Sequence, residues 1–281
     1  MTKTITNRHF TGERALFKCS DVHLVDCLLN DGESHIKESR DVTATNCRFS
    51  WKYPLWYGNN LTVEGGTLLP EARAAIWYST NVKFSNVKIL APKAFRRAKN
   101  VTLTDVEFTD AAETLWGCSY VKMVNVHAVG NYFGMNSTDI TATNLTIDGN
   151  YCFDGAKNIT LRNCVLNSKD SFWNCDNVTV YDTVIRGEYL GWNSRNLTFV
   201  NCTIDSLQGL CYIDGLKLVN CRLADTNLCF EYCSNIDADI TGNIVSVKNP
   251  LSGKIVADGY GEIILDDNDV DHTKTQLIVR E

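Results

Sequence analysis

One nine-residue pattern recurs along most of the chain and constrains the fold more than any other feature. Copies include DVHLVDCLL from Asp21, NVTLTDVEF from Asn100 and NLTFVNCTI from Asn196. We take the first aliphatic residue of each copy as its anchor, and successive anchors are 19 to 21 residues apart. A short, even period of this kind indicates a solenoid. The twelve anchors are Val22, Val42, Leu61, Val82, Val101, Val121, Ile140, Ile159, Val178, Leu197, Leu216 and Ile236.

Each copy has the periodicity of a short β-strand followed by a corner. Apolar residues occupy the anchor and the position two residues later, as at Val101 and Leu103, which is typical of strands. Four residues after the anchor, the first eleven copies have Asn, Asp or Gly, which tolerate a left-handed backbone. We therefore predict an all-β right-handed parallel β-helix of about 12 coils with three parallel sheets. In each coil two short strands flank the corner, and a third precedes the next anchor.

The two ends of the chain depart from the pattern, and no linker interrupts it. Residues 1–15 precede the first coil, and from about residue 244 the chain continues as IVSVKNPLSGKIVADGYGEIIL. A solenoid must cover its terminal edges or polymerise through them. We therefore predict a single domain over residues 1–281, with an N-terminal cap at 1–15, coils at 16–243 and a C-terminal cap at 244–281.

The positions of the 12 cysteines argue against a metal or redox role. Nine of them lie five residues after an anchor or three residues before one, where other coils mostly have small residues. There is no C-x-x-C motif, and the five histidines do not cluster with cysteines at zinc spacing. We predict buried thiols, no metal and no cofactor.

Charge and hydropathy exclude several classes of partner. The formal net charge is −6 and no basic stripe is present, which argues against nucleic acid. No apolar run approaches the ~18 residues of a membrane span. The N-terminal segment MTKTITNRHFTGER lacks the apolar core of a secretory signal, so a cytoplasmic location is expected.

A column of tryptophans lies five residues before successive anchors. Five of the six Trp share this slot, with Arg96 and Asp154 among its other members. The preceding slot is mostly Leu, Ile and Phe, so strand alternation predicts that the Trp slot points outward. Partial burial of these rings under loops is the alternative. Eight residues before the anchors, a second column includes Tyr53, Glu113, Tyr132, Tyr151, Asp170 and Tyr189.

An outward row of aromatic and charged side chains predicts ligand binding. Flat rings stack on the C–H faces of pyranoses, and polar groups satisfy hydroxyls or carboxylates. The same residue types also anchor protein partners. We therefore expect a glycan or small-molecule ligand, or else a protein partner or a second copy of the chain. The residues predicted to bind are Trp56, Tyr57, Trp77, Tyr78, Arg96, Arg97, Trp116, Trp173, Asn174 and Trp192.

Candidate catalytic residues are fewer. Hydrolysis of a polysaccharide uses two carboxyl groups about 5 to 9 Å apart. Asp154 and Asp170 are predicted to lie on adjacent coils, with Lys169 beside them. If the chain is an enzyme, these three residues are the candidates for a polysaccharide hydrolase or lyase.

Several segments that precede the anchors resemble a bacterial family of β-helix proteins of unknown function. They include WKYPLWY (51–57), ARAAIWY (72–78), APKAFRR (91–97) and GEYLGWNS (187–194). The resemblance covers essentially the whole chain and implies a right-handed β-helix in a bacterial, intracellular protein, without any activity or catalytic residue. Pectin lyases and polygalacturonases are similar only in fold, which does not determine function. Two hypotheses follow, namely binding or processing of a glycan along the aromatic face, and a noncatalytic interaction scaffold.

Overall fold

The computed structural model describes residues 2–281. These residues form two compact units, with the division between residues 141 and 142. Nearly all regular structure is β-strand, and the helical structure among the described residues is one 3₁₀ turn, His272–Lys274. The predicted all-β parallel solenoid is confirmed.

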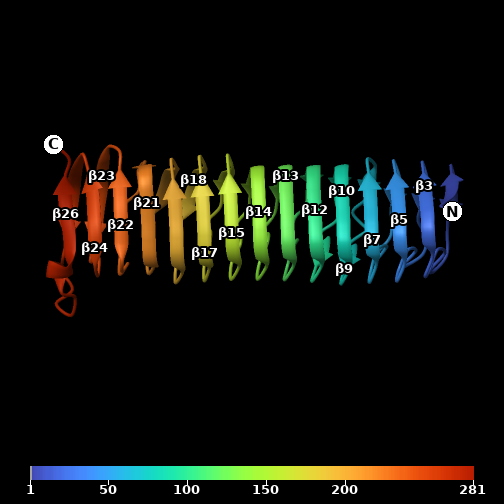
Figure 1. Ribbon diagram of the computed structural model, residues 1–281, viewed down its shortest axis with the longest axis horizontal. Coiled ribbons are helices and arrows are strands. Elements are labelled where there is room, and N and C mark those ends of the chain that lie inside the picture. Colours follow the sequence, from blue (N-terminus) through green and yellow to red (C-terminus); the bar gives the residue numbers. More distant parts are fainter. Residues whose placement is uncertain (1) are drawn as a thin grey trace. The chain divides into compact units, whose positions relative to one another are not determined.

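In the first unit, parallel strands stack in sequence order, from blue to green in Figure 1. The anchors pair in register from coil to coil, Val22 with Val42, Val42 with Leu61, and Leu61 with Val82. The strands are β1 (Lys3–Thr6), β2 (His9–Phe10), β3 (Ser20–Val25), β4 (Leu28–Leu29), β5 (Arg40–Thr45), β6 (Arg48–Phe49), β7 (Asn59–Glu64), β8 (Thr67–Leu68), β9 (Ile76–Trp77), β10 (Thr80–Ile89), β11 (Phe95–Arg96), β12 (Lys99–Phe108) and β13 (Ser119–Val129), with β14 (Thr138–Asp148) spanning the boundary.

The second unit repeats this arrangement. Ile159 pairs with Val178, and Leu197 pairs with both Val178 and Leu216. Later, β22 pairs with β21 after a register shift between Leu218 and Cys221, and β24 and β26 follow in parallel. The strands are β15 (Lys157–Arg162), β16 (Val165–Asn167), β17 (Asp176–Tyr181), β18 (Val184–Glu188), β19 (Arg195–Val200), β20 (Thr203–Leu207), β21 (Asp214–Leu223), β22 (Ile236–Ile240), β23 (Asn243–Lys248), β24 (Gly253–Ala257), β25 (Gly259–Ile264) and β26 (Thr275–Val279).

The predicted corners have the predicted conformation. All eleven residues four positions after an anchor have a positive φ, for example 54° at Asn125 and 67° at Gly65. Their amides also bond from coil to coil, as where Asn220 Nδ2 donates to Asn201 Oδ1 at 2.9 Å. Asparagine is suited to this position because it tolerates the left-handed region and its side chain both donates and accepts.

The interior of each unit is a stack of apolar side chains. In the first unit the Phe95 ring lies 5.3 Å from the Phe84 ring and 6.2 Å from the Phe108 ring, and all three are buried. The cysteines share this environment, since all 12 are free and eleven are buried. Burial raises the pKa of Cys118 to about 12, so this thiol is protonated and unreactive at neutral pH.

The number of coils differs from the prediction. The chain forms about 15 turns rather than about 12. The additional strands lie in the terminal segments, where β1 pairs with β3, and β24 and β26 continue the stack beyond the last anchor. These segments lack the nine-residue phrase yet pair in parallel, because backbone hydrogen bonds between stacked strands do not require a particular sequence.

The third side of each coil is mostly turn rather than the predicted strand. Among the described residues β9 pairs with β11 on this side, and single bridges join Arg96 to Trp116 and Cys229 to Val247. Elsewhere alternate residues have a positive φ, as at Asp170 (53°), Phe172 (59°) and Asn174 (54°). Hydrogen bonds between coils persist, since the Asp170 N–H donates to the Glu188 carbonyl at 2.8 Å. Because the backbone alternates between left-handed and right-handed conformations, this side is shorter than a strand would be. The backbone hydrogen bonds between neighbouring coils are kept.

Candidate functional site

We call the residues five positions before the anchors the tryptophan column. Its tryptophans are half-buried, whereas the preceding residues, such as Leu55, Ile76 and Phe95, are fully buried. The tryptophan column therefore lies on the outer side of the coils, as alternation predicts. What the column can bind depends on which parts of its rings are free.

In the first unit the tryptophan column is a continuous stack. The rings of Trp56 and Trp77 are 5.2 Å apart and 9° from parallel. The Arg96 guanidinium lies between two rings, 4.6 Å from Trp77 and 4.7 Å from Trp116. Lys37 Nζ lies 6.0 Å from the Trp56 ring. Because these neighbours occupy the ring faces, the flat surfaces that would stack on a sugar are already used within the protein.

Polar contacts fix this stack further. Trp77 Nε1 donates to the Lys93 carbonyl at 2.9 Å, and Trp56 Nε1 donates to the Ala74 carbonyl. Arg96 forms an ion pair with Glu113 at 2.9 Å. The rings and the guanidinium are thus held by several contacts each, which is the behaviour of a structural ladder.

A second, more exposed pair lies beside this stack. The rings of Tyr57 and Tyr78 are 5.0 Å apart and 9° from parallel, and the Arg97 guanidinium lies 6.0 Å from Tyr78. Tyr57 is 49% exposed. Tyr78 is 37% exposed, so this pair suits contact with a surface better than enclosure of a small ligand.

In the second unit the stack breaks and a cavity forms. The rings of Trp173 and Trp192 are 6.5 Å apart and 64° from parallel, so they do not share faces. Trp173 stacks on Tyr151 at 5.9 Å, and Trp192 meets Tyr189 edge-on at 5.8 Å and Tyr212 at 4.6 Å with a tilt of 32°. A cavity of about 460 Å³ is lined by Tyr151, Asp170, Trp173, Tyr189, Trp192 and Gln208, and we call it the aromatic cavity.

The aromatic cavity has a carboxyl group whose protonation its surroundings modify. Burial raises the pKa of Asp170 above its ordinary value, and the charge of the nearby Glu188 raises it further. A hydrogen bond with Tyr151 acts in the opposite direction. Raising the pKa of a carboxyl group favours its neutral form. Asp170 can therefore accept a hydrogen bond from a ligand and, when protonated, donate one.

The side-chain amide of Gln208 is oriented by a network with Glu231 and Lys248. Its Nε2 donates to Glu231 Oε2 at 2.5 Å, and Glu231 forms an ion pair with Lys248 at 2.8 Å. Glu231 is buried, so this charge is compensated by the two partners. The network orients Gln208 where it lines the aromatic cavity, which reduces the cost of ordering it on binding.

Of the predicted site residues, the structure brings Asp170, Trp173 and Trp192 together in the aromatic cavity. Asp154 instead accepts a hydrogen bond from Asn174 Nδ2 at 3.3 Å. Lys169 forms an ion pair with Glu188 at 3.0 Å. The three candidate catalytic residues therefore do not line one cavity.

Three lining residues were not among those predicted to bind, namely Tyr151, Tyr189 and Gln208. All three lie eight positions before an anchor, in the same column as Asp170. The spacing was visible in the sequence, but the approach of this column to the tryptophan column depends on the turns of the third side. Sequence alternation alone does not give those turns.

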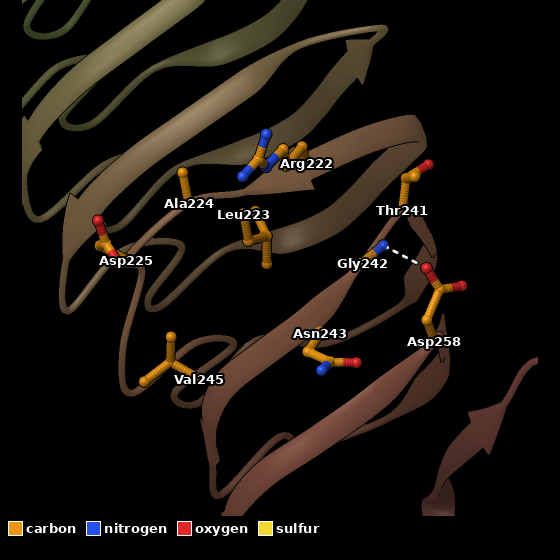
Figure 2. Close-up of a pocket in the computed structure, with 9 residues that line it drawn as sticks. All are labelled: Arg222, Leu223, Ala224, Asp225, Thr241, Gly242, Asn243, Val245 and Asp258. Carbon is orange, nitrogen blue, oxygen red and sulfur yellow. Dashed lines mark hydrogen bonds between the residues drawn. The ribbon is translucent and has the colours of Figure 1, made fainter.

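Another cavity of about 460 Å³ in the second unit lies between the end of β21 and the start of β23 (Figure 2). Its lining includes Arg222, Thr241, Asn243 and Asp258 and no aromatic ring. Asp258 is engaged by the Gly242 N–H at 2.6 Å, which Figure 2 shows, and by Arg280. Lacking a flat apolar surface, this cavity suits a sugar less well than the aromatic cavity.

Two negative findings apply to residues 2–281. They contain no group of three or more His, Cys, Asp or Glu side chains that could hold a metal ion. No helix among them is long and apolar enough to cross a membrane.

Fold and site together define a parallel β-solenoid with an aromatic column along its outer side. The chain belongs to the DUF3737 family of proteins of unknown function, whose sequence pattern matches residues 3–278. No curated protein matches its sequence.

Solved structures with a similar fold include phage tailspikes and an adhesin. A double mutant of the tailspike protein of E. coli bacteriophage HK620 has a TM-score of 0.51 and 9% identity, covering 93% of this chain and 72% of that chain. A single mutant of this tailspike, in complex with pentasaccharide, has a TM-score of 0.48, 9% identity and the same coverage. PfbA, a surface adhesin of Streptococcus pneumoniae, has a TM-score of 0.40 and 10% identity, covering 98% of this chain and 84% of that chain. At such identities the likeness shows the fold alone.

Proposed function

We propose that the protein binds a carbohydrate in the aromatic cavity of its second unit. The observation that carries the proposal is the break in ring stacking between Trp173 and Trp192, at the position where Asp170 and Gln208 enter. A sugar needs a flat apolar surface for its C–H face and polar groups for its hydroxyls. The cavity volume of about 460 Å³ lies within the usual range for small-molecule sites.

Binding without cleavage is the activity that the residues favour. Hydrolysis uses two carboxyl groups, and Asp170 is the one carboxylate among the six residues that line the aromatic cavity. A lyase would need an unprotonated base. A hydrogen bond with Glu188, followed by the charge of Glu188, raises the pKa of Lys169, so this amine stays protonated.

The test is a screen of neutral and acidic oligosaccharides on a glycan array, followed by calorimetric titration of the best ligand. We expect Trp192→Ala to weaken that ligand at least tenfold, which corresponds to about 1.4 kcal/mol. Trp77→Phe is the matched control, because Trp77 belongs to the stack of the first unit. Absence of any bound oligosaccharide would refute the proposal, and release of new reducing ends would contradict binding without cleavage.

The alternative is a noncatalytic scaffold that contacts a protein partner or a second copy of the chain. It is favoured by the exposed pair Tyr57 and Tyr78, with Arg97 nearby, since Tyr and Arg are frequent anchors of interfaces. Light scattering after size-exclusion chromatography tests self-association. A dimer that becomes monomeric in the double variant Tyr57→Ser and Tyr78→Ser would support the scaffold.

A further inference from the structure

The longest coil of the repeat forms a pocket around the one tryptophan outside the tryptophan column. Leu61 and Val82 are 21 residues apart, whereas other successive anchors are 19 or 20 apart. Within this coil the Ala72 N–H donates to the Leu69 carbonyl at 2.9 Å, closing a turn. Pro70 occupies the second position of that turn, where its fixed φ is favourable.

This turn projects beside the preceding coil. A pocket of about 370 Å³ is lined by Trp51, Lys52, Pro70, Glu71 and Arg73, all in the first unit, and we call it the Trp51 pocket. A volume of this size is within the usual range for a small ligand. The turn of the longer coil thus supplies Pro70, Glu71 and Arg73 to the lining of this pocket.

The ring of Trp51 is partly exposed and has no aromatic partner among residues 2–281. Its exposed fraction is 37%. Trp56 and Trp77 differ, because their faces are stacked on each other. Trp51 therefore offers the flat apolar surface that the stack of the first unit cannot offer.

The charged groups of the Trp51 pocket supply both donors and an acceptor. Lys52 is paired with Glu33 at 2.7 Å, so its charge is largely compensated. Arg73 and Glu71 also line the pocket, and neither forms an ion pair within residues 2–281. One guanidinium and one carboxylate are thus free to bond a ligand, and their charges balance.

This combination selects for one kind of ligand. Each sugar hydroxyl both donates and accepts a hydrogen bond, so it can use a guanidinium and a carboxylate together. An acidic ligand would gain the attraction of Arg73 but meet the like charge of Glu71, and a cationic ligand would experience the reverse, so neither charge is favoured by this pair. We propose that the Trp51 pocket binds an uncharged pyranose, with its C–H face on Trp51 and its hydroxyls on Arg73 and Glu71. This site uses no residue of the aromatic cavity and goes beyond the function proposed there.

The experiment is a ¹⁹F NMR titration of the full chain labelled with 5-fluorotryptophan. The Trp51, Trp173 and Trp192 signals are assigned from the single variants Trp51→Phe, Trp173→Phe and Trp192→Phe. The probes are cellohexaose, maltohexaose and mannohexaose, with hexagalacturonate as the acidic counter-probe. We expect the Trp51 signal to shift with at least one uncharged probe.

Variants in the pocket make the test specific. Arg73→Leu and Glu71→Leu should each weaken the probe that shifts Trp51 by about tenfold, because each leaves hydroxyls without a charged partner. Tyr120→Phe, at an exposed residue of the first unit outside the pocket, should leave the affinity of that probe unchanged. All three substituted side chains are exposed, so the fold should persist, and far-UV circular dichroism checks this.

The outcomes are separable from those of the proposed function. A Trp51 signal that moves with no uncharged probe overturns this inference, as does a signal that moves only with hexagalacturonate. Trp173 and Trp192 report on the aromatic cavity in the same titration. Shifts confined to them would overturn the Trp51 pocket and leave the proposed function standing.

Discussion

Replacing Trp77 by alanine removes three interactions that connect neighbouring coils of the first unit. The ring stacks on Trp56 at 5.2 Å, lies 4.6 Å from the Arg96 guanidinium, and donates from Nε1 to the Lys93 carbonyl at 2.9 Å. An aromatic pair contributes about 1 kcal/mol beyond area burial. A partly exposed cation–π contact and a hydrogen bond contribute about 1 kcal/mol each. Trp77→Ala should therefore lower the free energy of unfolding by about 3 kcal/mol.

Urea unfolding followed by far-UV circular dichroism measures this loss. Trp77→Phe is the control, because it keeps a ring between Trp56 and Arg96 and removes the N–H donor, which should cost about 1 kcal/mol. Solenoids can unfold in parts, so the denaturant slope must be compared before midpoints are converted into free energies.

Two results would refute the reasoning about the stack. One is a loss of less than about 1 kcal/mol for Trp77→Ala, which would mean that the stacked rings hardly stabilise the coils. The other is an equal loss for phenylalanine and alanine, which would show that the ring faces do not matter. Either result would return the tryptophans of the first unit to the list of candidate ligand-binding residues.

Three further predictions concern the second unit. The pKa of Asp170 is higher in the folded state than its ordinary value of 3.8, so folding favours the protonated carboxyl group. The stability that this preference contributes is fully present below pH 3.8 and is lost as the pH rises through the folded-state pKa. Asp170→Asn should therefore be more stable than the parent at pH 7, with the gain vanishing below pH 3.8 in a pH series of thermal unfolding; a constant gain would contradict this. Phe172 is buried, with its ring 5.7 Å from Phe153 and 6.4 Å from Phe199. Phe172→Ala should lower the free energy of unfolding by about 3 to 5 kcal/mol, measured by urea unfolding. A loss near zero would mean that Phe172 is not part of the core. Asn201, with φ 54°, should tolerate glycine better than alanine, because glycine adopts this conformation without steric cost; equal urea midpoints for the two variants would show that the corner is not strained.

The stacking of coils could be predicted because it follows from periodicity alone. An anchor every 19 to 21 residues places like residues above one another, and the observed pairing of Val22 with Val42 and of Ile159 with Val178 is the direct result. The corners were equally accessible, since Asn, Asp and Gly signal a left-handed backbone. The cytoplasmic location, the bacterial origin and the single domain stay predictions.

The third side could not be predicted in the same way. Its left-handed positions include Tyr151, Phe153 and Phe172, which are residue types that normally avoid a positive φ. Hydrogen bonds between coils and ring contacts, such as that between Phe153 and Phe172, hold them there, and both depend on the rest of the solenoid. A prediction based on the backbone preferences of the residues therefore assigns a strand where the chain makes turns. It also misses the cavity that these turns form.

The residue eight positions before an anchor offers a physical reason why the tryptophan column stacks in one unit and opens in the other. In the first unit Ala74 occupies this position in the coil of Trp77, and Tyr53 occupies it in the coil of Trp56, where its ring is tilted by 42° rather than stacked on the indole. Trp77 lies flat on Trp56. In the second unit Asp170 occupies it in the coil of Trp173, which stacks on Tyr151 of the preceding coil, and Tyr189 occupies it in the coil of Trp192 and meets that ring edge-on. A ring face occupied by a tyrosine is not available to the next tryptophan, so Trp173 and Trp192 turn apart. The column of tryptophans is thus common to both units, and the neighbouring column decides where it stabilises coils and where it can receive a ligand.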